Sequence, residues 1–200
     1  MALTETQSLR SVTVSTAAAT EPVSVPEAKA FLRVDHSDDD ALIGALIKAA
    51  RGSIERQTGR AMVSQTVTEK MPYATAMAGV EFGRTPATSV TSVSFYDTDG
   101  TLQTVAAADY TARTDSEPGT LRLDEAQTDP DTSRGDCVVV VYEVGSATSA
   151  SVPESLNTAV KMLVAHLYEH RSGDDRLKPG DVKVPPTIDY LLEPYTINDL

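Results

Sequence analysis

Ser24-Val25-Pro26-Glu27 and Ser151-Val152-Pro153-Glu154 are two copies of one tetrapeptide, and each precedes a run of apolar residues with helical spacing. In such a tetrapeptide the serine hydroxyl can accept a free N–H of the first helical turn, and the glutamate can reach back. Proline is tolerated where no amide donor is needed. Because the chain between the two runs has the period-two spacing of strands, the sequence predicts an α+β fold. Its helical bundle body, made of N-terminal helices plus helix 153–171, would carry an antiparallel β insert.

The helical runs have clear starts and stops. The first is expected from Ser24 to about Arg33, and the second opens at Asp38-Asp39-Asp40, because aspartates favour the positive end of the helix dipole. Gly59 supplies a left-handed stop for the second helix. Two apolar stripes are expected to share one core; they comprise Leu42, Ile43, Leu46, Ile47, Ala50 and Ile54, then Leu156, Val160, Leu163, Val164 and Leu167.

The middle of the chain predicts several short strands. Asp97-Thr98-Asp99-Gly100 is a hairpin-turn sequence between two of them. The strands are expected over residues 63–69, 90–95, 101–105, 110–113, 119–123 and 137–144.

Four segments follow from these patterns. Residues 1–22, rich in Ser, Thr and Ala, are expected to be a flexible arm. The helical body covers 23–60 and 151–172, the β-rich insert 61–150, and a partner-docking tail 173–200. In that tail, apolar residues have little chain left to cover them, so they either contact a partner or fold back on the body; they are Ile188, Tyr190, Leu191, Leu192, Tyr195 and Ile197.

The charge of the chain limits its partners. The formal net charge is −12, and residues 61–150 hold 13 acidic and 5 basic residues. Because duplex binding depends on Lys and Arg neutralising phosphates, this charge argues against a DNA-gripping surface. Cys137 is the only cysteine, so an intrachain disulfide is impossible and a buried thiol is expected. No membrane segment or secretory signal is expected.

One motif suggests catalysis. His166-Leu167-Tyr168-Glu169-His170 matches the H-x-x-E-H pattern of inverted zincins, which makes a zinc hydrolase a distant alternative. Such a site needs a third ligand, and the only other histidine, His36, is remote in sequence. A helix end with His170 and Arg171 in its last turn explains the motif without metal. We therefore expect neither enzymatic activity nor a cofactor.

A resemblance joins these patterns. The segments Val25 to Asp35, Asp39 to Ile43 and Ile54 to Arg60, followed by Ser92 to Asp97 and Val164 to Arg171, resemble the head-to-tail connector (adaptor) family of tailed bacteriophages and gene transfer agents. The similarity covers about residues 23–195 and is most specific in the N-terminal half.

The resemblance implies a structural virion protein. It would form a ring, commonly of twelve copies, in the neck of the particle between the capsid portal protein and a tail or stopper protein. DNA would pass through the ring without specific binding, and an acidic wall would repel its phosphates. Candidate ring-contact or lumen residues are Asp38, Asp39, Asp40, Asp97 and Asp99. Another neck or tail-completion protein is the alternative.

Overall fold

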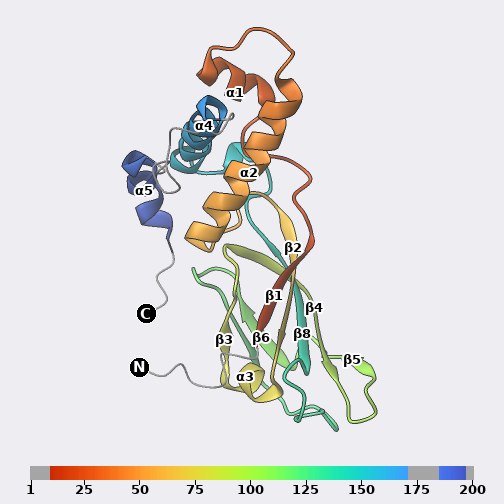
Figure 1. Cartoon of the computed structure of the whole chain (residues 1–200). Coiled ribbons are helices and arrows are strands. Elements are labelled where there is room, and N and C mark those ends of the chain that lie inside the picture. Colours follow the sequence, from red (N-terminus) through yellow and green to blue (C-terminus); the bar gives the residue numbers. More distant parts are fainter. Residues whose placement is uncertain (1–9, 171–184, 197–200) are drawn as a thin grey trace, which may run out of the picture. The chain divides into compact units, whose positions relative to one another are not determined.

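The computed structural model describes residues 10–170 and 185–196 and confirms an α+β protein with antiparallel sheets (Figure 1). The described chain divides into two compact units. Residues 10–19 and 64–145 form one, called here the β unit. Residues 20–63, 146–170 and 185–196 form the other, the helical unit. The chain therefore passes between the units three times, after residues 19, 63 and 145.

The helical unit follows the predicted order of helices. Within it α2 packs against α4, α1 contacts both of them, and α5 contacts α4. None of the helices in the described residues is long and apolar enough to cross a membrane. The elements are α1 (Val25–Leu32), α2 (Asp40–Thr58), α4 (Glu154–Glu169), α5 (Pro186–Leu192) and two 3₁₀ turns, Ser149–Ser151 and Glu193–Tyr195.

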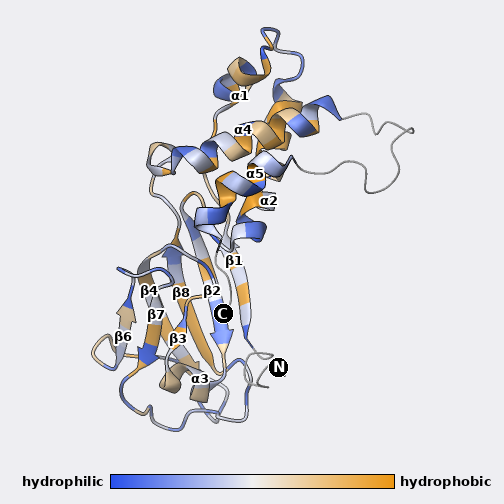
Figure 2. Ribbon diagram, turned by 90° about the vertical axis from the view of Figure 1, so that its left-hand side faces the viewer, coloured by the Kyte–Doolittle hydropathy of each residue, from blue (hydrophilic) through white to orange (hydrophobic). Residues whose placement is uncertain are grey.

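The core of the helical unit comes from one stripe of each long helix. The stripe of α2 that the sequence predicts is buried at four positions, and that of α4 likewise, as the hydrophobic bands along these helices in Figure 2 indicate. Gly59 ends α2 with a left-handed φ of 71°, as predicted. The buried stripe residues are Ile43, Ile47, Ala50, Ile54, Leu156, Val160, Leu163 and Val164.

The two Ser-Val-Pro-Glu copies behave differently. At the first, the Ser24 hydroxyl accepts the N–H of Glu27, and the Glu27 carboxylate accepts the Ser24 N–H at 2.7 Å, which completes a capping box. At the second, the prediction is wrong, since Pro153 is the N-cap residue of α4 and no side chain caps the helix. The reason is local: Ser151 ends a 3₁₀ turn, and its hydroxyl bonds that of Thr148 at 2.8 Å.

The β unit contains two antiparallel sheets. The larger has the strand order β1-β2-β8-β4-β5, and the smaller has β3-β7-β6. The rings of Phe82, beside β3, and Tyr142, on β8, lie 4.5 Å apart and join the two sheets. The strands are β1 (Ser11–Thr16), β2 (Gln65–Met71), β3 (Val80–Glu81), β4 (Ala87–Tyr96), β5 (Leu102–Thr104), β6 (Tyr110–Arg113), β7 (Thr120–Leu123) and β8 (Val138–Val144).

One face of the larger sheet is buried. Along β2 and β8 every second residue is buried, including Val67, Glu69, Val140 and Tyr142. This is the alternation that a half-buried strand requires. Cys137, immediately before β8, is buried and free, as predicted.

Three elements of the β unit were not predicted. These are β1, the short helix α3 (Tyr73–Ala78) and the two-residue strand β3. The expectation of a flexible arm over residues 1–22 is wrong for Ser11–Thr16, because β1 pairs with β2 from Ser11↔Lys70 to Val14↔Val67 and bulges before Thr16. In Figure 1, β1 lies beside β2 at the edge of the sheet.

Candidate functional site

The predicted docking residues of the tail separate into buried and exposed groups. Ile188 and Leu192 are one turn apart on α5 and are 0% and 1% exposed. They therefore hold α5 in the helical unit, and the prediction that they offer a free docking surface is wrong for this structure. The fold-back alternative applies to them. Ile197 lies outside the described residues.

Tyr190 is the exposed member among the described residues of the predicted set. Its side chain is 74% exposed, whereas Leu191 and Tyr195 are partly buried. The position of α5 is fixed from α2, because the Gln57 amide donates to the Asp189 carboxylate at 2.9 Å. The Arg60 guanidinium also lies 5.7 Å from the centre of the Tyr195 ring. Tyr190 is thus presented on an anchored helix.

The three aspartates before α2 serve different purposes. Lys29 of α1 forms a 2.7 Å ion pair with Asp40, and the Tyr168 hydroxyl of α4 donates to Asp39. These two acids join the start of α2 to its neighbours. Asp38 is exposed. Of the three, Asp38 is the one left facing solvent.

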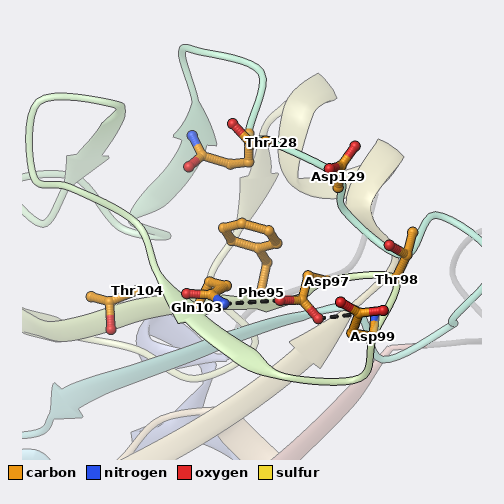
Figure 3. Close-up of a pocket in the computed structure, with 9 residues that line it drawn as sticks. Phe95, Asp97, Thr98, Asp99, Gln103, Thr104, Thr128 and Asp129 are labelled. Carbon is orange, nitrogen blue, oxygen red and sulfur yellow. Dashed lines mark hydrogen bonds between the residues drawn. The ribbon is translucent and has the colours of Figure 1, made fainter.

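Asp97 and Asp99 line an open hollow of about 350 Å³ in the β unit (Figure 3). Asp97 accepts hydrogen bonds from the Gln103 amide at 2.8 Å and from the N–H groups of Thr101 and Asp99. The bond from Gln103, followed by those from the backbone, lowers the pKa of Asp97. This arrangement closes the β4–β5 turn, with Gly100 at a φ of 79°. The predicted hairpin turn is confirmed.

The far wall of this hollow is formed by another loop. Asp129 has a left-handed φ of 52°, and its carbonyl accepts the N–H of Thr98 at 3.0 Å. Gln127 and Thr128 complete this side, as Figure 3 shows for Thr128. Among residues 10–170 and 185–196, no group of three or more His, Cys, Asp or Glu is placed to hold a metal ion. The hollow therefore offers polar groups without a formed cation site.

The H-x-x-E-H motif lies at the end of α4. The rings of His166 and His170 are 4.5 Å apart, and Nδ1 of His170 lies 2.8 Å from the His166 carbonyl oxygen. Glu169 and His170 are both exposed. Within the described part of the chain the motif gains no third metal ligand. The contacts are those of a helix end.

A buried carboxylate that the sequence analysis did not single out organises the β unit. Glu69 of β2 is 0% exposed and forms an ion pair with Arg10, which precedes β1. Its second oxygen accepts the Tyr142 hydroxyl at 2.9 Å and the Gly83 N–H at 3.1 Å. Burial, and then the charge of Glu69, raises the pKa of Tyr142 far above its usual value, so the tyrosine remains a donor.

Gly83 lets β1 approach this carboxylate. A Cβ at position 83 would lie 2.5 Å from a Val12 methyl and 3.3 Å from the Arg10 guanidinium. Arg10 also donates to the Glu81 carbonyl. Residues 10–12 are thus held by the ion pair of Arg10 with Glu69 and by the packing of Val12 against Gly83. Period-two spacing placed Glu69 on a strand, but nothing local indicated a partner 59 residues away.

The helical unit has its own buried carboxylate. Glu55 is 7% exposed; it accepts the Arg51 guanidinium at 2.9 Å and the Met62 N–H at 2.9 Å. Arg51 also donates to Glu21 at 2.7 Å. Glu21 lies at the start of the helical unit, before the N-cap residue Ser24 of α1, so this cluster holds the entry of the chain into that unit.

The fold and these ion pairs define the class of protein: an α+β protein with an inserted β unit, in which each unit has a buried carboxylate paired with an arginine. A family model of head completion proteins matches residues 21–196. The chain belongs to the head completion protein family. No curated protein matches it.

Solved structures have the same fold. A chain from the neck of an empty gene transfer agent particle, computed with C6 symmetry, matches with a TM-score of 0.76 at 21% identity, covering 95% of this chain and 97% of that one. A chain from the virion of a native gene transfer agent particle matches at 0.76 and 23%, covering 94% and 97%. A third, from the neck of a native particle computed with C12 symmetry, matches at 0.68 and 22%, covering 94% and 97%.

Proposed function

We propose that this chain is a structural, non-enzymatic virion protein. It forms a ring in the neck of a phage or gene transfer agent particle, joins the capsid portal to the tail, and lets DNA pass through its channel. Membership of the head completion protein family carries the proposal. The C12 symmetry in the description of one similar structure supports twelve copies. In this proposal the protein is made in the bacterial cytoplasm and acts in the particle.

The charge of the protein suits passage of DNA. An acidic wall repels phosphates, whereas a basic wall would bind them and slow the strand. Asp39, Asp40 and Asp97 are engaged within the fold. Asp38 and Asp99 are exposed, and these two are the channel-wall candidates that we retain.

The helical unit provides the body and the docking surface in this proposal. The helices act as a bundle, and the tail over residues 173–200 joins the portal or a tail protein. Tyr190 is the described contact residue, because an exposed aromatic side chain is a typical interface anchor.

The docking role is tested with Tyr190→Ala. We expect its incorporation into particles to fall at least fivefold with an unchanged melting temperature. The matched control is Leu102→Ala, at an apolar side chain 49% exposed in the β unit. Equal incorporation of both variants would remove Tyr190 from the interface. Deleting residues 186–200 is a less specific test, because it also removes buried Ile188 and Leu192.

Two other functions are alternatives to this proposal. A different neck or tail-completion protein would have the same parts and a different neighbour. A zinc hydrolase would require stoichiometric zinc in the purified protein, lost on His166→Ala or His170→Ala. Elemental analysis of these proteins decides that case.

Cryo-electron microscopy of the intact parent particle tests the main proposal. We expect this chain to fit ring-shaped density between portal and tail. Density elsewhere in the neck or tail would favour the other completion role. Absence of the chain from the neck and tail would reject both.

A further inference from the structure

Among the described residues, the outer edge of β1 has little of the usual protection against pairing, since the bulge before Thr16 is its one guard. β1 is the first strand of its sheet and, among the described residues, pairs only with β2. All six of its residues are exposed, and the sequence Ser-Val-Thr-Val-Ser-Thr has neither charge nor proline. Its pairing is regular from Ser11 to Val14. Monomeric proteins usually guard such edges with lysine, proline, bulges or a covering element.

The opposite side of the same sheet has a second open stretch. β5 pairs only with Ser94–Tyr96, so residues 87–92 of β4 have no strand on their outer side in the described part of the chain. Thr88, Ser89 and Thr91 are exposed there, and β4 contains no charged residue. Bulges at 87/89 and 90/92 bend the strand. Both stretches are six residues long.

The charge of the protein favours these two edges for contact between copies. Each copy carries a net charge of −12, and residues 61–150 hold 13 acidic against 5 basic residues. Like charges facing each other across an interface oppose association. Two uncharged strand edges avoid that repulsion, and their backbone N–H and C=O groups supply the attraction.

The strand directions also allow β1 of one copy to pair with β4 of another. Every neighbouring pair in the order β1-β2-β8-β4 is antiparallel, so β1 and β4 run in opposite directions. Continuing the sheet into a second copy in the same orientation therefore places β1 of one copy antiparallel to β4 of the other. Such a head-to-tail contact can repeat around a closed ring, whereas pairing of β1 with β1 would stop at a two-fold dimer.

We propose that the outer edge of β1 pairs with residues 87–92 of β4 on a second copy of this chain, so that the larger sheet continues from subunit to subunit. The proposal rests on the ring proposed above and names the surfaces that close it.

Lysine substitutions on the two edges test the contact. Thr13→Lys and Thr91→Lys each place a charge on an exposed edge position, and Thr132→Lys places the same charge in an exposed loop. We expect each edge variant to reduce ring occupancy in particles at least tenfold, and Thr132→Lys less than twofold. If wild-type particles contain the ring and both edge variants occupy it at the normal level, the proposed strand pairing is overturned, while the proposed ring stands. Particles without any wild-type ring would overturn the proposed function and, with it, this contact.

Thiol crosslinking provides a second test that does not weaken assembly. A chain carrying both Thr13→Cys and Thr91→Cys, treated in particles with a short thiol crosslinker, should give a ladder of multimers. Each single variant should stay monomeric, since Cys137 is buried. Dimers from Thr13→Cys alone would indicate β1–β1 pairing and overturn the proposal. A crosslink from Thr13→Cys to a different chain of the particle would overturn it as well.

Discussion

Glu69 in the β unit and Glu55 in the helical unit are both buried carboxylates, and each is paired with its own arginine. The sequence separation between carboxylate and arginine differs greatly between the two pairs. Arg10 is 59 residues from Glu69, whereas Arg51 precedes Glu55 by four residues on the same helix. Glu69 is fully buried, and Glu55 retains slight exposure. The β unit thus depends on a contact between remote segments, and the helical unit on one that α2 makes by itself.

This difference shows where each unit is vulnerable. If α2 forms, Arg51 and Glu55 lie on one face of it. Forming β2 does not bring Arg10 to Glu69, because β1 must also reach the sheet edge. The N-terminal strand is therefore a structural part of the β unit, and its loss would leave a buried charge unpaired.

Removing the remote arginine should have the largest effect. Arg10→Ala leaves Glu69 without its cation, and we expect a loss of about 3 kcal/mol in the free energy of unfolding, at the low end for a buried pair because Arg10 is 22% exposed. Urea denaturation measures this loss. Arg10→Lys, which keeps the charge, should recover part of it. A loss below about 0.5 kcal/mol, typical of surface substitutions, would contradict the role of Glu69.

The shape of the β1 contact can be tested separately. Gly83→Ala puts a methyl group 2.5 Å from Val12, and we expect a destabilisation of about 2 kcal/mol from overpacking. Adding Val12→Ala should relieve the clash, so a double-mutant cycle should give a favourable coupling of about 1 kcal/mol. Strictly additive effects would show that Val12 does not pack on Gly83.

In the helical unit the equivalent change should be milder. Arg51→Ala removes the partner of Glu55 and Glu21, but Glu55 keeps some access to water, whereas Glu69 has none. We expect a loss of about 1–2 kcal/mol, smaller than for Arg10→Ala. The two variants should be compared by urea denaturation under the same conditions. A larger loss in the free energy of unfolding for Arg51→Ala than for Arg10→Ala would contradict the contrast between the units.

The smallest effects are expected at the two repeated tetrapeptides. Ser24→Ala should cost about 1 kcal/mol by loss of a cap, and Ser151→Ala less than about 0.5 kcal/mol because it caps nothing. The hydrogen bond from Ser24 lowers the pKa of Glu27, so its stabilisation is present above the ordinary glutamate pKa and is lost as pH falls through the lowered value. The cost of Ser24→Ala should therefore shrink in acid. Thermal unfolding at pH 7 and pH 3 compares the variants, and equal costs at Ser24 and Ser151 would refute the difference.

Local signals in the sequence predicted most of the fold. The Ser24 capping box, the stop at Gly59 and the turn at Asp97 to Gly100 each depend on residues within one or two turns of each other. The class and the order of the long elements follow from such signals. The capping prediction for the second tetrapeptide is wrong because the Ser151 hydroxyl bonds that of Thr148 instead. The tetrapeptide sequence alone does not reveal this contact.

Other features depend on contacts between remote segments. Val12 and Val14 alternate over too few residues to indicate a strand, and β1 is stabilised by Glu69 and Gly83 far along the chain. Ile188 and Leu192 are spaced to face one way, yet spacing does not say whether that face meets a partner or the rest of the chain. The sequence therefore proposed six tail residues for docking, of which Tyr190 is the strongly exposed one among those described.

The three passages of the chain between the units, after residues 19, 63 and 145, have a mechanical consequence. A unit joined by a single linker is released by one proteolytic cut, and that linker bears any pulling force alone. Here a cut in any one passage leaves two covalent tethers, and tension between the units is shared among three lengths of backbone.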